Sequence, residues 1–318
     1  MEIYLAPLEG ITGSLFRSIQ LKHFGGVDKY FTPFISATGK AVLTPKILDE
    51  ILPEKNEGQY LVPQILTKSS EAFIFMCKAL EQYGYKEFNL NLGCPSGTVT
   101  AKGKGSGFLA HKEDLDRFLE EIFKSPYSIS VKTRIGYETP EEFYELLAIY
   151  NKYPLKELII HPRTRQDMYK NTPKLEVYTY GEKNSRAEVC YNGDIFNIMD
   201  YNRFSDSFPH TKKLMIGRGV ITDPSFPAVL KGGNKADNKA LRDFTFDLYY
   251  SYKEVLPGSI PLLHKMKELM SYMLMGYEDC GKTGKKIKKS KSPSEFEYAL
   301  EELFYTGKLL SIPQLKNS

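Results

Sequence analysis

Short apolar runs alternate with amphipathic stretches along the first 235 residues of the chain. In runs such as 129–133, apolar and polar side chains occupy alternate positions, which is the period of a β-strand. The pattern predicts strands at 3–6, 30–35, 60–65, 88–92, 129–133, 158–161, 189–192 and 214–216. Helical periodicity follows most of them and is clearest at 72–83, 112–123 and 141–150.

Eight strands, nearly all followed by helices, predict an α/β fold. Their number, spread over about 230 residues, is typical of a (β/α)8 TIM barrel. The competing architecture is a doubly wound parallel sheet, which would place GxGxxG after the first strand. Gly103, Gly105 and Gly107 are spaced GxGxG and come too late in the chain for that role.

The pattern changes after Gly232-Gly233-Asn234. From there the chain shows helical periodicity only, at 241–254, 263–274 and 294–304, with a break at 257–261. A chain of 318 residues can hold one large barrel and a small additional domain. We therefore predict a TIM-barrel catalytic domain at 1–235 and a small all-helical domain at 236–318.

Positive charge is concentrated in the helical tail. The net charge of +4 is too small to indicate a nucleic-acid partner by itself. Between residues 282 and 291, however, six lysines occur without an acidic residue. This run is either a solvated face or a patch for a phosphate backbone. Lys265 and Lys267 on the preceding predicted helix favour the phosphate patch.

Cysteine usage and hydropathy restrict the class of protein. The four cysteines show neither CxxC nor zinc-ligand spacing, which argues against a disulfide framework and against a structural metal. No apolar run approaches transmembrane length, and no N-terminal signal pattern is present. With 42% apolar residues, enough for a sizeable core, the chain is predicted to be a soluble, cytoplasmic monomer.

The stretch 89–109, NLNLGCPSGTVTAKGKGSGFL, has the strongest chemical signal. A strand ends abruptly at Gly93-Cys94-Pro95, because proline cannot extend the ladder and glycine tolerates a sharp exit. The following glycines and lysines predict a mobile basic loop. In parallel α/β proteins, catalytic groups stand at such strand ends. Cys94 is therefore a catalytic candidate, and the alternative is a small buried hydrophobic residue.

The C-terminal ends of barrel strands share one rim, so their residues can be collected whatever their separation in sequence. The predicted rim holds Pro7, Glu9, Gln64, Asn91, Cys94, Lys132, Arg134, His161, Arg163, Asn192, Gly193, Asp194, Gly217, Arg218 and Gly219. The last two turns, NGD and GRG, suit a phosphate, because glycine exposes backbone N–H groups and Arg218 adds a forked charge. Taken singly, each is also an ordinary turn sequence.

Lys132 and His161 indicate what else the rim binds. Lys132 should point into the barrel, where its ammonium needs an anion. A reduced flavin would supply one, and Gln64 could bond the same ring, whereas the alternative is a buried Lys–Glu pair. No second histidine or paired carboxylate lies at ligand spacing from His161, which favours a ligand contact over a metal site.

Several motifs then occur together in a characteristic order: LAPLEG, NLNLGCPSGTV with GKGSGFL, VKTRIG, HPRTRQDMY, YNGDI and MIGRG. In these the chain resembles the tRNA-dihydrouridine synthases from about residue 3 to residue 222. The helical tail is similar to that family's C-terminal RNA-binding domain. One departure is HPRT, where family members usually have HGRT.

The resemblance implies an FMN-dependent enzyme that uses NADPH to reduce the C5–C6 bond of a uridine in tRNA. Carried over residue by residue, it implies flavin contacts at Pro7, Leu8, Glu9, Gln64, Lys132, His161, Asn192, Gly193, Asp194, Gly217 and Arg218. Cys94 takes the position of the general acid. We expect the uridine and tRNA contacts to be Asn91, Arg134, Arg163, Lys265, Lys267, Lys285 and Lys286.

Two other functions remain open at this level. The first is a flavin-dependent dehydrogenase of a free pyrimidine, of the dihydroorotate or dihydropyrimidine type, which would not need the tail. The second is a non-catalytic barrel that binds RNA, which would purify without the yellow colour of a flavin.

Overall fold

A single parallel sheet forms the centre of the molecule. The structure, a computed structural model, describes residues 1–39 and 43–312, so residues 313–318 of the predicted helical domain lie outside the described residues. The sheet has the order β3-β5-β6-β7-β8-β9-β10-β1-β2-β4. Its strands are β1 (Glu2–Leu5), β2 (Lys29–Phe31), β3 (Ile35–Ser36), β4 (Leu61–Val62), β5 (Gln64–Leu66), β6 (Glu87–Leu92), β7 (Ser128–Gly136), β8 (Leu158–Thr164), β9 (Val189–Tyr191) and β10 (Lys213–Ile216).

The sheet closes into an eight-stranded barrel, as predicted. The strands at the two ends of this order, β3 and β4, are each one half of an interrupted barrel strand. β2 continues along the chain into β3, and β4 continues into β5. Pro33 and Pro63 lie at the interruptions, where a residue without an N–H cannot serve the ladder. Since β2 pairs with β4 and β3 pairs with β5, the two interrupted strands run side by side and the ring is complete.

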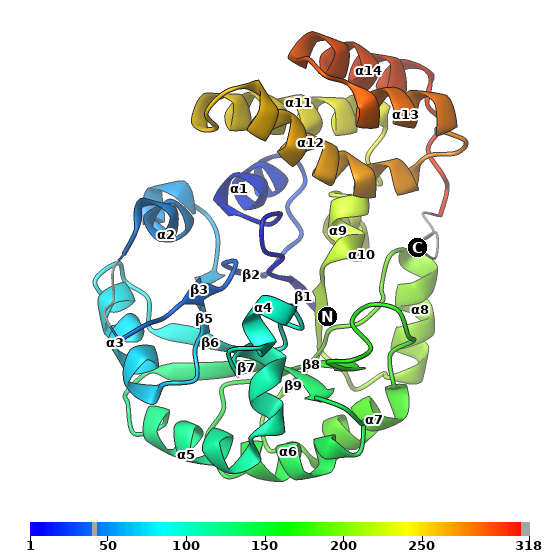
Figure 1. Cartoon of the computed structure of the whole chain (residues 1–318). Helices are drawn as coiled ribbons and strands as arrows, with labels where there is room; N and C mark the ends of the chain where they lie inside the picture. Colours follow the sequence, from blue (N-terminus) through cyan, green and yellow to red (C-terminus); the bar gives the residue numbers. More distant parts are fainter. Residues whose placement is uncertain (40–42, 313–318) are drawn as a thin grey trace.

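Helices cover the outside of the barrel (Figure 1). In α5 the buried residues Leu115, Phe118, Leu119 and Ile122 recur at helical spacing and face the strands. The helical elements of this part of the chain are α1 (Ser14–His23), α2 (Pro45–Ile51), η1 (Pro53–Lys55), α3 (Ser70–Glu81), α4 (Gly97–Thr100), η2 (Gly105–Ala110), α5 (Lys112–Ile122), α6 (Glu142–Tyr150), α7 (Leu175–Asn184), α8 (Ile198–Ser207), α9 (Arg218–Thr222) and α10 (Phe226–Leu230).

The barrel interior has an apolar middle and a charged base. The middle is a cluster of Tyr4, Ala6, Phe31, Val62, Ile159, Cys190 and Met215. At the amino-terminal ends of the strands, the fully buried Glu157 accepts hydrogen bonds from Lys29 (2.8 Å), Lys213 (3.2 Å) and the Tyr4 hydroxyl (3.0 Å). These bonds satisfy the buried charges, so the base of the barrel is closed.

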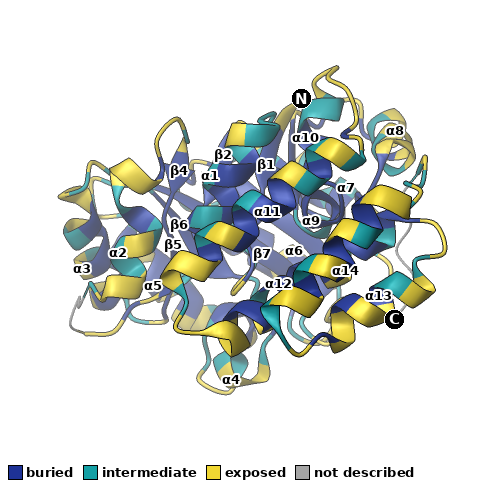
Figure 2. Ribbon diagram, turned by 90° about the horizontal axis from the view of Figure 1, so that it is seen from above, coloured by how far each residue is buried: buried dark blue, intermediate teal, exposed yellow. Residues whose placement is uncertain are grey.

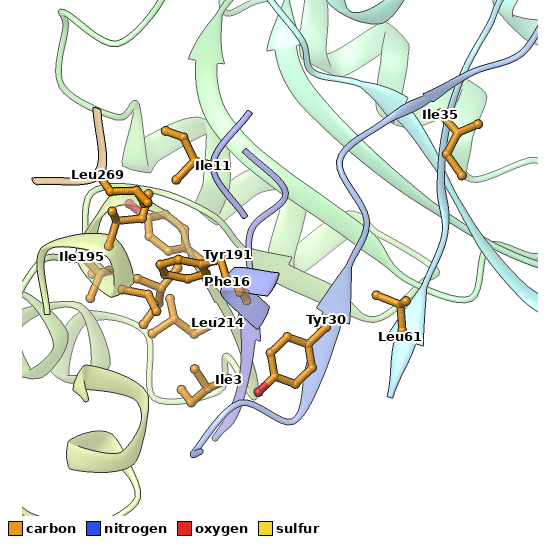
Figure 3. Packing of buried hydrophobic residues seen from close by; sticks show 14 of the residues in the cluster. Ile3, Ile11, Phe16, Tyr30, Ile35, Leu61, Tyr191, Ile195, Leu214 and Leu269 are labelled. Atoms are coloured by element: carbon orange, nitrogen blue, oxygen red, sulfur yellow. The ribbon is translucent and has the colours of Figure 1, made fainter. Parts of the chain in front are cut away.

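The helical tail packs beside the barrel mouth. It consists of α11 (Asn238–Val255), α12 (Ser259–Met273), η3 (Leu274–Gly276), α13 (Gly281–Lys289) and α14 (Pro293–Thr306). α11 lies on α1, where Phe244 meets Phe16 edge to face at 5.9 Å, and α12 lies on α9. Figure 2 shows the tail helices with buried inner and exposed outer faces. In Figure 3, Leu269 of α12 belongs to the same cluster as Ile11 and Ile195 of the barrel.

The structure corrects three sequence-based boundaries. Most of the lysine run forms a helix, α13, which was not predicted because its five lysines leave only Ile287 and Gly284 to face the protein. Helix α12 begins at Ser259 inside the predicted break, since Pro261 lies in the first turn, where its missing N–H has no intrahelical partner. β8 continues past Pro162 through a register shift opposite Arg134 and Gly136.

One hydrophobic cluster runs from the outer layer of the barrel into the tail, and the domain boundary after residue 235 stays a prediction. Among the described residues, no helix is both long and apolar enough to cross a membrane.

Candidate active site

Cys94 stands directly after β6, at the carboxyl end of the barrel, with its side chain half-buried. The backbone around it is fixed from both sides. Asn91 Oδ1 accepts hydrogen bonds from the N–H groups of Gly93 (3.0 Å) and Cys94 (2.9 Å). The Cys94 carbonyl accepts from the backbone N–H (3.1 Å) and the hydroxyl (2.9 Å) of Ser106. The backbone that carries the thiol is therefore held at a defined position.

The loop after Cys94 is compact, and its predicted mobility stays a prediction. It folds into α4 and η2, and residues 105–109 are buried. Gly105 has φ +57°, and a Cβ there would lie 2.8 Å from the Cys94 carbonyl oxygen. A Cβ at Gly107 would lie 2.7 Å from the Thr100 carbonyl oxygen. These glycines serve close backbone packing and not flexibility.

A line of side-chain amides connects the barrel interior to Cys94. Asn89 Nδ2 donates to Ser130 Oγ (2.8 Å), Gln64 Nε2 donates to Asn89 Oδ1 (2.8 Å), and Asn91 Nδ2 donates to Gln64 Oε1 (2.7 Å). Gln64, Asn89 and Ser130 are almost fully buried. Gln64 and Asn91, expected as flavin and uridine contacts, thus both lie in the network that positions the backbone of Cys94.

Two cationic side chains face the thiol from β7. Arg134 is fully buried, and it donates to the carbonyls of Gly93 (2.9 Å) and Thr164 (2.7 Å). Its Nη2 has no acceptor in the described part of the chain. Burial, and then the charge of Arg134, lower the pKa of Lys132 to about 8. No carboxylate pairs with Lys132 among residues 1–39 and 43–312, so the structure does not show the alternative Lys–Glu pair.

The environment of Cys94 favours the protonated thiol. Burial raises its pKa, and this effect outweighs the opposing hydrogen bond from the Ser96 backbone and the charges of Lys132 and Arg134. A raised thiol pKa means that Cys94 is a proton donor at neutral pH and not a resting nucleophile.

His161, Arg163, Asp194 and Arg218 form a second polar group at the mouth. Arg163 donates from Nη1 and Nη2 to the two carboxylate oxygens of Asp194, at 2.9 and 2.5 Å, and from Nε to the Asn171 carbonyl. Arg218 donates to the same carboxylate at 2.9 Å. Arg163 is only 1% exposed and supports Asp194 from inside the protein, and its expected contact with tRNA stays a prediction.

The protonation state of His161 follows from its neighbours. Its Nε2 lies 3.1 Å from Arg163 Nη1, and because a guanidinium can only donate, Nε2 must accept. Burial and the charges of Arg134, Lys132, Arg163 and Arg218 lower the pKa of His161 well below its usual value. His161 is therefore neutral, with its proton on Nδ1 available for donation.

The remaining predicted flavin contacts lie around the same mouth. Asn192 is buried and donates to the Met215 carbonyl at 2.9 Å. A Cβ at Gly193 would lie 2.0 Å from the Tyr191 hydroxyl, so only glycine fits there. Gly217 lies against Ala6 and Leu8 after β10. Pro7 is half-buried and Glu9 is exposed, where it pairs with Lys46.

The predicted tRNA-binding lysines differ in whether their ammonium groups already have a partner within the protein. Lys265 donates to the Gly10 carbonyl, and Lys267 donates to the Ser290 carbonyl at 2.5 Å, so both contribute to tail packing. Lys286 pairs with Glu302 at 2.7 Å. Lys285 is exposed and forms no ion pair within the described ranges. The structure brings none of these four lysines next to Cys94.

Sequence reasoning missed Tyr169, which lies at the mouth with its ring centroid 6.0 Å from that of His161. It is part of the HPRTRQDMY motif, but an exposed tyrosine in a loop has no sequence signal that separates it from an ordinary surface residue. The mouth combines one protonated thiol with four cationic side chains and the partly buried carboxylate of Asp194, and the carboxylates of Glu9 and Asp167 lie close enough to act on Cys94 and Arg134. This arrangement suits an anionic ligand.

Comparison with known proteins shows the family of the chain. The family model described as dihydrouridine synthase (Dus) matches residues 4–293. A relative from Bacillus subtilis (strain 168) named probable tRNA-dihydrouridine synthase 2 is 28% identical over 313 residues, which cover 94% of this chain and 92% of that protein. The tRNA-dihydrouridine(16) synthase of Shewanella oneidensis is 26% identical over 315 residues, covering 95% and 98% of the two chains.

Solved structures show the same barrel at much lower identity. A histamine dehydrogenase from Rhizobium sp. 4-9 has a TM-score of 0.56 at 11% identity, covering 77% of this chain and 49% of that chain. Morphinone reductase has a TM-score of 0.52 at 11% identity, with coverages of 74% and 87%. At these identities the likeness concerns the fold alone. Because the family model spans most of the sequence, the chain belongs to the dihydrouridine synthase family.

Proposed function

We propose that the chain reduces the C5–C6 double bond of a uridine in tRNA, with FMN as its bound flavin, NADPH as the reductant and Cys94 as the acid. One observation supports this above the others. A thiol whose raised pKa keeps it protonated is held beside Lys132 and Arg134, which form no ion pair in the described part of a chain that matches the family over residues 4–293.

The donors at the mouth suit a flavin. The Lys132 ammonium and Arg134 Nη2 both lack an acceptor among the described residues, and the electron-rich edge of a flavin ring would supply acceptors. Gly217 and Arg218, at the end of β10, would hold the phosphate. When bound, the flavin supplies a hydride to uracil C6 and NADPH restores it.

The residues of this chain would complete the reaction. Hydride addition at C6 leaves negative charge on the uracil, and the unpaired Arg134 Nη2 would donate to the oxygen on which that charge develops. Cys94 would protonate C5 from the opposite face, and its thiolate would regain a proton from solvent, because the side chain is only half-buried. Asn91 and Ser106 hold the backbone of Cys94.

The test is the Cys94→Ala variant, with Cys280→Ala as its control. Cys280 is the other half-buried cysteine and lies in the tail. We expect Cys94→Ala to keep its flavin and to oxidise NADPH normally, while dihydrouridine formation in unmodified tRNA falls by about 10²–10⁴-fold, the usual contribution of a positioned acid. Cys280→Ala should retain activity. Dihydrouridine would be measured by mass spectrometry of nuclease-digested tRNA.

Other outcomes identify other functions. Near-normal turnover by Cys94→Ala would remove the acid role. Reduction of free uracil or uridine as fast as tRNA would favour a dehydrogenase of free pyrimidines. Wild-type protein that binds tRNA but contains no flavin would favour a non-catalytic RNA-binding barrel.

A further inference from the structure

An aromatic–arginine cluster of Arg134, Tyr169, Phe196 and Arg218 crosses the barrel mouth. The Tyr169 ring centroid lies 5.3 Å from the guanidinium carbon of Arg134 and 5.1 Å from that of Arg218. The guanidinium of Arg218 lies also over the Phe196 ring, at 5.1 Å. Within this cluster, Tyr169 is therefore the residue that contacts both Arg134 and Arg218.

The loop after β8 presents Tyr169 in a defined conformation although the residue is 45% exposed. Asp167 Oδ2 accepts hydrogen bonds from the Thr164 N–H (2.8 Å) and hydroxyl (3.0 Å), which closes a turn. Met168, next to Tyr169, has φ +52°, an unfavourable left-handed conformation for a methionine. Such a conformation persists only where its surroundings determine it, and it is typical of functional sites.

The two arginines that Tyr169 contacts have different partners. Arg134 is held by backbone carbonyls near Cys94 and keeps one free nitrogen, Nη2. Arg218 is bonded to Asp194, on the side of the mouth formed by the turns after β9 and β10. Among the described residues, Arg134 and Arg218 have no hydrogen-bond partner in common. The Tyr169 ring contacts both guanidiniums. The Tyr169 ring thus lies where the base side and the phosphate side of the mouth meet.

We infer that Tyr169 is a positioning residue that fixes the guanidinium planes of Arg134 and Arg218 and separates the cofactor phosphate from the incoming RNA. This inference rests on the function proposed above. A guanidinium on a flexible stem samples many orientations, and an aromatic face restricts them through cation–π attraction. Because the ring contacts both arginines, its loss should loosen both ligand sites together.

The fold should tolerate changes at Tyr169. Without the ring, Arg134 keeps its two carbonyl acceptors, and Arg218 keeps Asp194 and Phe196. The ring is half-exposed, so its removal creates no buried cavity. The effects should therefore appear in ligand binding and not in the temperature of unfolding.

The experiment compares Tyr169→Phe, Tyr169→Leu and Tyr169→Ala in the flavin-loaded protein. Tyr305→Ala is the control, because Tyr305 is 92% exposed at the end of α14, outside the cluster. The readouts are the FMN dissociation rate, followed by the recovery of flavin fluorescence after dilution, KM and kcat for unmodified tRNA, and the midpoint of thermal unfolding.

We expect FMN to dissociate about tenfold faster from the Leu and Ala variants, the loss that one or two partly desolvated cation–π contacts imply. KM for tRNA should rise several-fold with a smaller change in kcat. The Phe variant, which keeps the aromatic face, should stay within about threefold of the wild type in both. All variants should unfold near the wild-type temperature.

Two results would overturn the inference. Wild-type FMN release and KM in Tyr169→Leu would mean that bulk suffices and the aromatic face does nothing. Unchanged values in Tyr169→Ala would remove any role of the residue. Either result, with a flavin-loaded wild type that forms dihydrouridine, would leave the proposed function standing. A wild type without flavin or without dihydrouridine formation would instead contradict the proposed function.

Discussion

Replacing Lys132 by methionine should stabilise the ligand-free protein and weaken flavin binding. The ligand-free fold holds the Lys132 ammonium in a partly desolvated site beside Arg134, and burial lowers its pKa from 10.5 to about 8. A difference of this size corresponds to about 3 kcal/mol against the charged form in the folded state. We take about 2 kcal/mol, because the side chain is half-buried and retains some hydration. Methionine fills a similar volume without charge.

The pH dependence of this effect has a definite sign. A lysine whose pKa is lowered in the folded state destabilises the fold by its full amount well below pH 8, where it is protonated in both the folded and the unfolded chain. Between about pH 8 and 10.5 the unfolded chain binds more protons than the folded one, so wild-type stability rises with pH. The advantage of Lys132→Met should therefore be largest at pH 7 and should fall by about half at pH 9.5.

Urea unfolding of flavin-free protein at pH 7 and pH 9.5 measures this difference. Lys156→Met is the control: Lys156 is an exposed lysine just before β8, at the opposite end of the barrel, and its change should stay within about 0.5 kcal/mol. With saturating FMN the order should invert, because the wild type binds the flavin more tightly. A variant less stable than wild type at pH 7, or an advantage independent of pH, would refute the reasoning.

Three further outcomes follow from the site and the tail. Asn91→Ala removes the acceptor of two backbone N–H groups and the donor to Gln64, so the free energy of unfolding measured with urea should fall by about 2–4 kcal/mol. Turnover should fall even in folded protein, and an unchanged unfolding midpoint would contradict the amide network. Asp194→Asn leaves two guanidiniums without a counter-charge, so the protein should lose about 2–3 kcal/mol in the same assay and regain part of it with added phosphate; equal stability would show that the pairing is dispensable. Lys285→Gln with Lys289→Gln should reduce the slope of log Kd for tRNA against log salt by about 1–2, and an unchanged slope in filter binding would place this face of α13 away from RNA.

Much of the architecture was predictable because its signals are local. Strand alternation and the helices that follow it indicated the barrel, and the Gly93-Cys94-Pro95 exit placed a thiol at a strand end, where the structure has it. Proline had a more subtle effect than expected. Pro63 interrupts a barrel strand without ending it, and Pro261 lies in the first turn of a helix. A missing N–H matters only where the element offers an acceptor for that N–H.

What only the tertiary structure decided is the partner of each polar group. Arg163, an expected substrate contact, donates from both terminal nitrogens of its guanidinium to Asp194, 31 residues later in the chain. Lys265, an expected RNA contact, donates from its ammonium to a carbonyl 255 residues away. The sequence by itself therefore determined which chemical groups reach the mouth, through backbone periodicity and strand ends. Which of those groups stay free for a ligand is decided by long-range packing, since a charge is available only where the fold leaves it without a partner.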